Sequence, residues 1–164
     1  MAEKKYILDK ATADQKLQRL ALEIAEQLDG QQSLIIIGVK TSGLVIAKKI
    51  GEFVKPYLPS VTIISATLDK RMPAEIQLSE EVDLNDKNVL ITDDVSNSGK
   101  TLLYVLKPLL SYHPRRIQTL VLVERMHKLF PIKPDYVGLS VATTLQDHIY
   151  VEVNNNEVTG AYVQ

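Results

Sequence analysis

The feature that most constrains this fold is the segment 34–39, which reads Leu-Ile-Ile-Ile-Gly-Val and contains no polar side chain. An uninterrupted apolar run of this length is typical of a parallel β-strand whose two faces are both buried. A half-exposed strand would instead alternate apolar and polar residues. The run therefore predicts a central strand in a parallel sheet that is covered by helices.

Helical patterns stand before and after this run. Thr12 and Gln15 have the spacing of a capping box, and apolar residues then recur at helical spacing until Gly30. A second helix is predicted from the Thr-Ser-Gly turn at 41–43 to Pro56, because its apolar residues lie on one face. These two predicted helices enclose the apolar run.

The rest of the chain continues the alternation of strands and helices. A third helix is predicted from about 101 to 112, with Pro108 expected to kink or shorten it. The segment 68–87 looks like a polar, acidic excursion. Further strands are predicted at 61–64, 89–92, 117–123, 136–141 and 149–153, and 158–163 is a candidate hairpin partner after a turn at 154–156. The pattern predicts one α/β domain over 1–164, with a mainly parallel twisted sheet flanked by helices.

Composition limits the class of protein. The 164 residues suffice for one domain, and the chain has no cysteine, hence no disulfide framework. No apolar run approaches the roughly 20 residues that span a bilayer, and no signal-peptide pattern occurs, so we expect a cytoplasmic protein without a membrane partner. The net charge of −1 gives no overall attraction to nucleic acid.

The charges are unevenly distributed along the chain. Acidic residues predominate from 75 to 94 and basic residues from 100 to 133. Two interpretations stay open at this stage. The charges either form solvated faces or surround a site that handles anions and has a metal-binding acidic side.

The segment 93–101 has the chemistry of an anion site. It reads Asp-Asp-Val-Ser-Asn-Ser-Gly-Lys-Thr and joins the predicted strand 89–92 to the third helix. A helix N-terminus offers unpaired backbone N–H groups and the positive end of the helix dipole. Gly99 lets the backbone approach an anion, Ser98 and Thr101 add hydroxyl groups, and Lys100 adds a positive charge. The segment therefore predicts a cradle for a phosphomonoester.

Two carboxylates complete this segment. Asp93 and Asp94 precede the cradle by about the length of a sugar, where they could accept hydrogen bonds from ribose hydroxyls or hold Mg²⁺. A Walker A loop is excluded because position 94 would have to be glycine, and the chain contains no G-x-G-x-x-G fingerprint. A polar turn before a capped helix is the alternative, although two acids that end an apolar strand would be costly there.

The segment resembles the phosphoribosyl pyrophosphate motif of type I phosphoribosyltransferases, and the likeness extends over most of the chain. The segment 38–43 resembles the pyrophosphate loop of that family, and 121–127 and 131–138 resemble its next strand and loop. The resemblance is greatest to the PyrR-type proteins, which are pyrimidine operon regulators and uracil phosphoribosyltransferases. Tyr6 to Asp9, followed by a helix, also fits that subgroup.

The resemblance implies an enzyme of nucleotide salvage that uses Mg²⁺ to transfer a phosphoribosyl group from phosphoribosyl pyrophosphate to a nucleobase such as uracil. It implies binding of the corresponding nucleoside monophosphate and assembly as a homo-dimer or tetramer. Asp93 and Asp94 would be catalytic and would hold the metal directly or through water, and a hood from about 135–164 would cover the base. The implied binding residues are Val95, Ser96, Asn97, Ser98, Gly99, Lys100 and Thr101 for the 5-phosphate, Lys40, Thr41, Ser42 and Gly43 for pyrophosphate, and His148, Ile149 and Tyr150 for the base.

Four departures from the family pattern bear on activity. Asn97 stands where purine-specific members often have an aspartate, and Glu124 where they tend to have a lysine, which argues against hypoxanthine or guanine. Ser42 replaces an arginine that is usual in the PyrR-type loop, and the 68–87 excursion is shorter than the catalytic loop of that group. The alternative is a catalytically weak regulator that senses nucleotides. RNA binding is a further option, although the first predicted helix is not basic.

Overall fold

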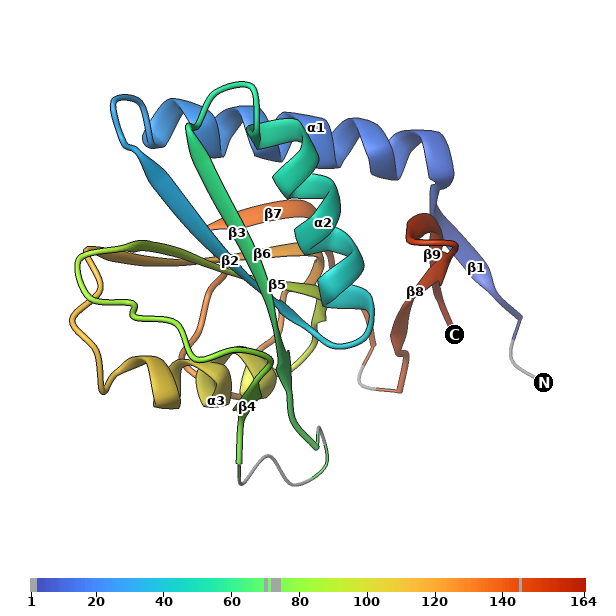
Figure 1. Ribbon diagram of the computed structural model, residues 1–164. Coiled ribbons are helices and arrows are strands. Elements are labelled where there is room, and N and C mark those ends of the chain that lie inside the picture. Colours follow the sequence, from blue (N-terminus) through green and yellow to red (C-terminus); the bar gives the residue numbers. More distant parts are fainter. Residues whose placement is uncertain (1–2, 70, 72–74, 145) are drawn as a thin grey trace.

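A computed structural model describes residues 3–69, 71, 75–144 and 146–164 (Figure 1). The elements in chain order are β1 (Lys5–Asp9), α1 (Lys10–Gln27), β2 (Ser33–Val39), α2 (Ser42–Val54), β3 (Ser60–Thr67), β4 (Gln77–Leu78), β5 (Asn88–Ser96), α3 (Lys100–Leu109), β6 (Arg116–Arg125), β7 (Tyr136–Val141), β8 (Ile149–Asn154) and β9 (Glu157–Val163). The prediction of a single α/β domain with a mainly parallel sheet is confirmed.

The main sheet has the strand order β4-β3-β2-β5-β6-β7. Neighbouring strands in the series β3, β2, β5, β6 and β7 are parallel. The short edge strand β4 pairs antiparallel with β3. The apolar run lies in β2, in the middle of this sheet. Gly38 of β2 is in register with Thr92 of β5, so the carboxyl ends of these two strands meet at one edge.

Two apolar cores explain why the run in β2 has no polar residue. On one face of the sheet, α1 and α2 pack over Ile36, and on the other, α3 packs over Ile35 and Ile37 (Figure 1). Ile36 and Ile37 have no exposed surface. Successive side chains of a strand point to opposite faces, so a strand between two helical layers must be apolar throughout.

A second, antiparallel sheet lies beside the main one and has the order β1-β9-β8 (Figure 1). Ile149 of β8 and Ala161 of β9 are buried in the core beneath α1 and α2. The segment Tyr136–Val141, which the sequence placed in the hood, is instead β7, the parallel partner of β6. Gly138 permits this pairing, because a Cβ atom there would lie 2.5 Å from the carbonyl oxygen of Leu122.

Two helix boundaries differ from the predicted ones. Helix α1 begins at Lys10, and its N-cap is Asp9, whose side chain accepts a hydrogen bond from the Thr12 N–H at 2.7 Å. The predicted capping box at Thr12 is therefore wrong, because an aspartate three residues earlier satisfies this N–H group. Helix α3 ends at Leu109, directly after Pro108, and is shorter than predicted.

The 68–87 excursion contributes to the fold. Leu78 of β4 pairs with Ala66 of β3, and Leu84 is fully buried in the core beneath α3. From the sequence, two basic residues of this excursion, Lys70 and Arg71, are expected to be able to reach an anion. Lys70 lies outside the described residues. Within the described ranges, no helix is both long and apolar enough to cross a membrane.

A buried hydroxyl joins α1 to the beginning of β6 and β7. The Tyr136 hydroxyl donates a hydrogen bond to the Gln27 side-chain oxygen at 2.9 Å and lies 3.0 Å from that of Gln118. We expect Tyr136→Phe to reduce the free energy of unfolding by about 1 kcal/mol, because Gln27 and Gln118 lose a buried partner. Urea denaturation measures this change. The same substitution at the exposed Tyr57 should leave stability unchanged, and equal effects at both positions would contradict the expectation.

Candidate functional site

The candidate site begins inside strand β5. The strand does not stop at residue 92 as predicted, because pairing with β6 continues from Asp93 opposite Val121 to Ser96 opposite Glu124. Asp93 is therefore buried, with 1% of its surface exposed, and Asp94 is half-buried. The two acids belong to the edge of the sheet where β2 also ends.

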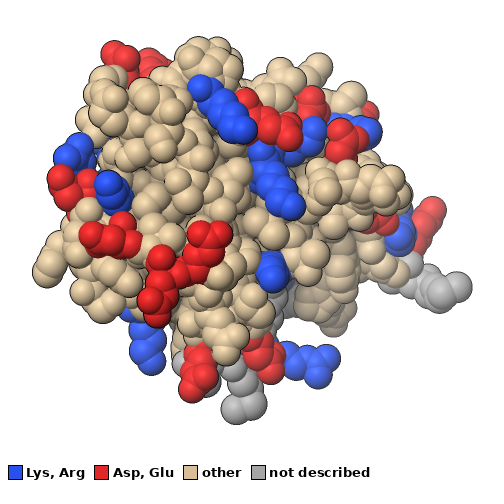
Figure 2. Space-filling view, viewed as in Figure 1, with Lys and Arg blue, Asp and Glu red and all other residues tan. Residues whose placement is uncertain are grey.

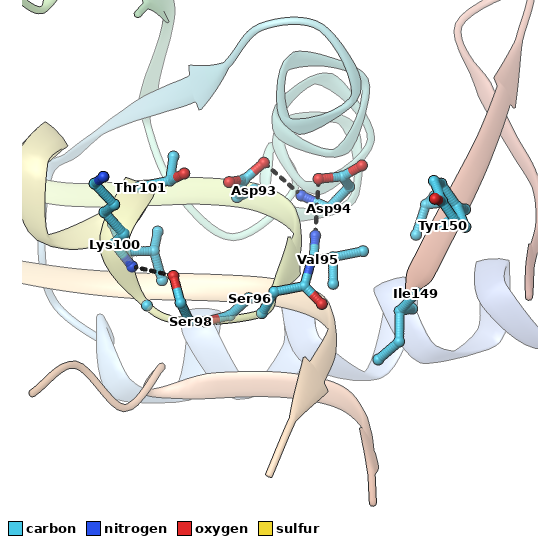
Figure 3. Close-up of a pocket in the computed structure, with 13 residues that line it drawn as sticks. Asp93, Asp94, Val95, Ser96, Ser98, Lys100, Thr101, Ile149 and Tyr150 are labelled. Carbon is cyan, nitrogen blue, oxygen red and sulfur yellow. Dashed lines mark hydrogen bonds between the residues drawn. The ribbon is translucent and has the colours of Figure 1, made fainter. Parts of the chain in front are cut away.

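Backbone hydrogen bonds orient both carboxylates. The Asp93 Oδ1 atom accepts from the Asp94 N–H at 2.9 Å, and the Asp94 Oδ1 atom accepts from the Val95 N–H at 2.8 Å (Figure 3). Each carboxylate is thus tied to the peptide group that follows it. The pair is held in place before any ligand arrives.

A cavity of about 240 Å³ opens next to these acids. Residues 93–101 line one side, and Ile149 and Tyr150 of β8 lie across from them (Figure 3). All seven predicted phosphate-binding residues, 95–101, are in the lining, and Leu102 and Val151, which the sequence analysis missed, also belong to it. His148 lies outside the lining, with its ring centroid 6.4 Å from that of Tyr150.

The N-terminus of α3 opens onto the cavity. Gly99 is its N-cap, with a φ of 84°, a left-handed conformation that favours glycine. The Ser98 hydroxyl accepts a hydrogen bond from the Lys100 N–H at 3.2 Å. The first turn of α3 therefore presents backbone N–H groups, the Lys100 charge and the Thr101 hydroxyl within one short segment, as a phosphate cradle requires.

The β6–β7 loop (residues 126–135) lies behind the cradle. Its Leu129 and Phe130 N–H groups both donate to the Ser98 carbonyl oxygen, at 3.1 and 3.0 Å. A Cβ atom at Gly99 would lie 3.4 Å from the Phe130 carbonyl oxygen. The loop and the cradle are thus in direct backbone contact.

Glu124 forms a buried ion pair at the start of this loop. Its carboxylate accepts hydrogen bonds from the Lys128 ammonium and the Ser140 hydroxyl, each at 2.7 Å, and the residue is 7% exposed. Burial alone would raise the pKa of Glu124, but the hydrogen bonds from Lys128 and Ser140 outweigh it and hold the pKa below its ordinary value. Glu124 is therefore occupied by internal partners.

The predicted pyrophosphate loop contacts Asp93 without entering the cavity lining. The Thr92 hydroxyl donates to the Gly43 carbonyl oxygen at 2.8 Å. A Cβ atom at Gly43 would lie 2.6 Å from the Thr92 carbonyl oxygen and 3.0 Å from the Asp93 Cα. Lys40 and Thr41, joined by a cis peptide bond, are exposed beside this contact, and Ser42 begins α2. The structure therefore brings Gly43 against Asp93, and none of residues 40–43 lines the cavity.

Two buried polar atoms in the cavity wall have no hydrogen-bond partner among the described residues. They are the Ser96 hydroxyl oxygen and the Asn97 side-chain oxygen. A buried polar atom without a partner is costly, and such atoms are commonly satisfied by a ligand or water. Because both atoms are inaccessible to solvent, they lie behind the cavity surface and not on it.

The acids fit a magnesium ion that is shared with a ligand. Among the described residues, no cluster of three or more metal-binding side chains occurs, so the protein alone does not form a full coordination shell. Mg²⁺ commonly binds one or two carboxylates and completes its octahedron with water and ligand phosphates. The pair Asp93 and Asp94 matches that arrangement.

Comparisons with known proteins concern the chain as a whole. The model of the phosphoribosyl transferase domain matches residues 5–154. The bifunctional protein PyrR of Latilactobacillus sakei is 34% identical over 161 residues, which cover 90% of this chain and 89% of that protein. The bifunctional protein PyrR of Limosilactobacillus fermentum is 32% identical over 160 residues, with the same coverage of 90% and 89%.

Solved structures share the fold at lower identity. The hypoxanthine phosphoribosyltransferase of Trypanosoma cruzi superposes with a TM-score of 0.81 at 17% identity, over 99% of this chain and 96% of that one. A hypoxanthine-guanine phosphoribosyltransferase of Bacillus anthracis gives a TM-score of 0.74 at 21% identity, over 87% and 85%. These similarities concern the arrangement of the chain.

The lowered pKa of Glu124 predicts a pH-dependent contribution to stability. Its ionised form is favoured in the folded state, so the contribution is fully present above the ordinary value of 4.5 and is lost as the pH falls through the lower folded-state pKa. We expect wild type to be more stable than Glu124→Gln at pH 7, and this difference to shrink below about pH 4.5. Denaturation at a series of pH values measures it.

A matched control is Glu26→Gln, which removes the same charge from an exposed position on α1. It should show little difference from wild type at any pH. A stability difference at Glu124 that stayed constant from pH 7 to pH 3 would contradict the assignment.

Proposed function

The chain belongs to the phosphoribosyl transferase family, and we propose that it transfers the phosphoribosyl group of phosphoribosyl pyrophosphate to a nucleobase and releases pyrophosphate. The observation that carries this proposal is the single cavity bounded by the phosphate cradle, the two acids and β8. A phosphate, a sugar and a base linked in that order would meet these three groups in turn.

The cradle binds the 5-phosphate of the substrate. The N–H groups at the N-terminus of α3, the Ser98 and Thr101 hydroxyls and the Lys100 ammonium surround one dianionic group. These contacts are the same in the ground state and the transition state. They therefore hold the substrate and position its C1′ atom without themselves lowering the barrier.

Asp93 and Asp94 act closer to the reacting carbon. The electrostatic interaction between the sugar and a carboxylate that accepts hydrogen bonds from its hydroxyls becomes more favourable as positive charge develops on the ring. The nitrogen of the base forms its bond to C1′ and gives up its proton to water or to the departing pyrophosphate, while the bond from C1′ to the pyrophosphate oxygen breaks. Mg²⁺ held by these acids and by substrate oxygens would neutralise the charge on the departing pyrophosphate.

The loop 40–43 receives the leaving group in this proposal. It lies against Asp93 through Gly43, and the exposed Lys40, at the end of β2, supplies a positive charge. Ser42 offers a hydroxyl where PyrR-type loops usually have an arginine. The grip on pyrophosphate is accordingly weaker, and the loop relies more on its backbone.

The base would lie between the end of β5 and β8. Ser96 and Asn97 line the cavity there, and Ile149 provides an apolar wall. Asn97 cannot accept a proton at neutral pH, and the Glu124 carboxylate is hydrogen-bonded to Lys128 and Ser140. Neither residue can therefore bind a purine as the aspartate and lysine of purine-specific members do. Uracil is therefore our first candidate base, in line with the PyrR-type resemblance.

A nucleotide-sensing regulator with weak turnover is the second candidate function. Two relatives are named bifunctional protein PyrR, and Ser42 and the short 68–87 excursion favour reduced catalysis. RNA as a partner finds less support, because acidic and basic side chains are interspersed on the face shown in Figure 2. A cytoplasmic location and a homo-dimer or tetramer stay predictions from the resemblance.

The enzymatic proposal predicts release of pyrophosphate. The protein incubated with phosphoribosyl pyrophosphate, Mg²⁺ and each common nucleobase in turn should release pyrophosphate with at least one base, with uracil tested first. A coupled pyrophosphate assay measures the release. Binding of nucleoside monophosphates or phosphoribosyl pyrophosphate by calorimetry without turnover of any base would favour the regulator. Absence of turnover and of any affinity for either kind of ligand would refute both functions.

The role of Asp94 predicts a catalytic defect in Asp94→Asn. Loss of the negative charge should lower kcat by about 100-fold, because it stabilises charge that develops only in the transition state. Thermal unfolding should be nearly unchanged, since Asp94 is only half-buried. Asp29→Asn, an exposed change of the same charge before β2, is the control. An unchanged kcat in Asp94→Asn would remove this residue from the chemistry.

A further inference from the structure

The Glu124–Lys128 ion pair is buried although the loop that follows it is exposed. The Lys128 and Glu124 side chains are 14% and 9% exposed, whereas Met126 and Leu129 are 61% and 86% exposed. Lys128 also donates to the Arg125 carbonyl oxygen at 3.2 Å. The buried pair thus holds the first half of the β6–β7 loop together with the hydrogen bond from the Met126 N–H to the Val141 carbonyl oxygen, at 3.1 Å.

The loop acts on the cradle through one peptide group. The Leu129 and Phe130 N–H groups, which directly follow Lys128, fix the direction of the Ser98 carbonyl. In a trans peptide the C=O and the next N–H point in opposite directions. The Gly99 N–H is therefore turned away from the loop, on the side of the cavity that Gly99 lines.

We propose that Glu124 and Lys128 are positioning residues for the phosphate cradle. Their ion pair holds the β6–β7 loop, the loop holds the Ser98 carbonyl, and this carbonyl aims the Gly99 N–H at the 5-phosphate. The inference rests on the proposed function only in naming the bound group as a 5-phosphate. Neither residue lines the cavity, so both act through the loop and not on the substrate.

The first experiment measures kinetics and binding in Lys128→Met. We expect KM for phosphoribosyl pyrophosphate to rise about tenfold while kcat changes less than about threefold, since a misdirected N–H weakens ground-state and transition-state binding alike. Calorimetry with phosphoribosyl pyrophosphate should show the same loss of affinity. Lys128→Arg keeps the pair and should stay within about threefold of wild type.

The control variant is Lys10→Met, which breaks an ion pair with Glu157 at the surface, away from the cradle. It should leave KM and affinity unchanged. Equal effects of Lys10→Met and Lys128→Met, or a fall in kcat without a change in KM, would overturn the positioning role. If Lys128→Met fails to fold, Glu124→Gln, which keeps the size of the side chain, takes its place.

The second experiment needs no turnover. Hydrogen exchange at the Leu129 and Phe130 amides reports the bonds to Ser98 directly, and in Lys128→Met both should exchange faster than in wild type. Unchanged protection at both amides would contradict the inference whatever the kinetics. Absence of phosphoribosyl pyrophosphate binding by wild type would instead refute the proposed function, while the exchange result would still decide whether the ion pair holds the loop.

Discussion

The contact between Gly43 and Thr92, inside β5, is the constraint on which the site depends. The hydrogen bond from Thr92 to Gly43 joins residues 49 positions apart in the chain, and the approach is too close for any side chain at position 43. It exists because β2 and β5 are adjacent, parallel and in register at Gly38 and Thr92. A buried apolar sheet thus places Gly43 of the loop 40–43 beside Asp93, at the edge where ligands of such sheets commonly bind.

Sequence alone predicted the parts of the fold that are buried on both faces. In β2, β5 and β6 the two cores require apolar side chains on both faces, so each strand contains an uninterrupted run of apolar residues in the sequence. The small sheet was harder, because β1 is only five residues long and its partner β9 lies at the other end of the chain, with Lys5 opposite Val163. Residue-level patterns contain little information about such distant pairing. The start of α1 was misplaced because Asp9 and Thr12 are both good caps.

The cradle was predictable because its chemistry is local. Residues 95–101 lie together at the start of one helix, so their order in the sequence is nearly their order in space. The wall across the cavity was less accessible to sequence reasoning: His148 was chosen, whereas Val151 is in the lining. Glu124 was noticed only as a departure from the family, since its partner Ser140 lies 16 residues away on another strand. The alternation of side chains along β8 was the signal in the sequence that could have identified Val151 as a lining residue.

The position of β9 has a consequence for how this molecule is made. It follows all other strands described in the sequence, yet it lies between β1 and β8 and forms backbone hydrogen bonds with both. The six-stranded sheet, with its cradle and acids, is complete by residue 141. On a ribosome, a nascent chain would thus possess the segment 93–101 before β8, which forms the opposite wall of the cavity, has any strand to pair with. The wall that β8 forms is therefore completed only when β9 pairs with it.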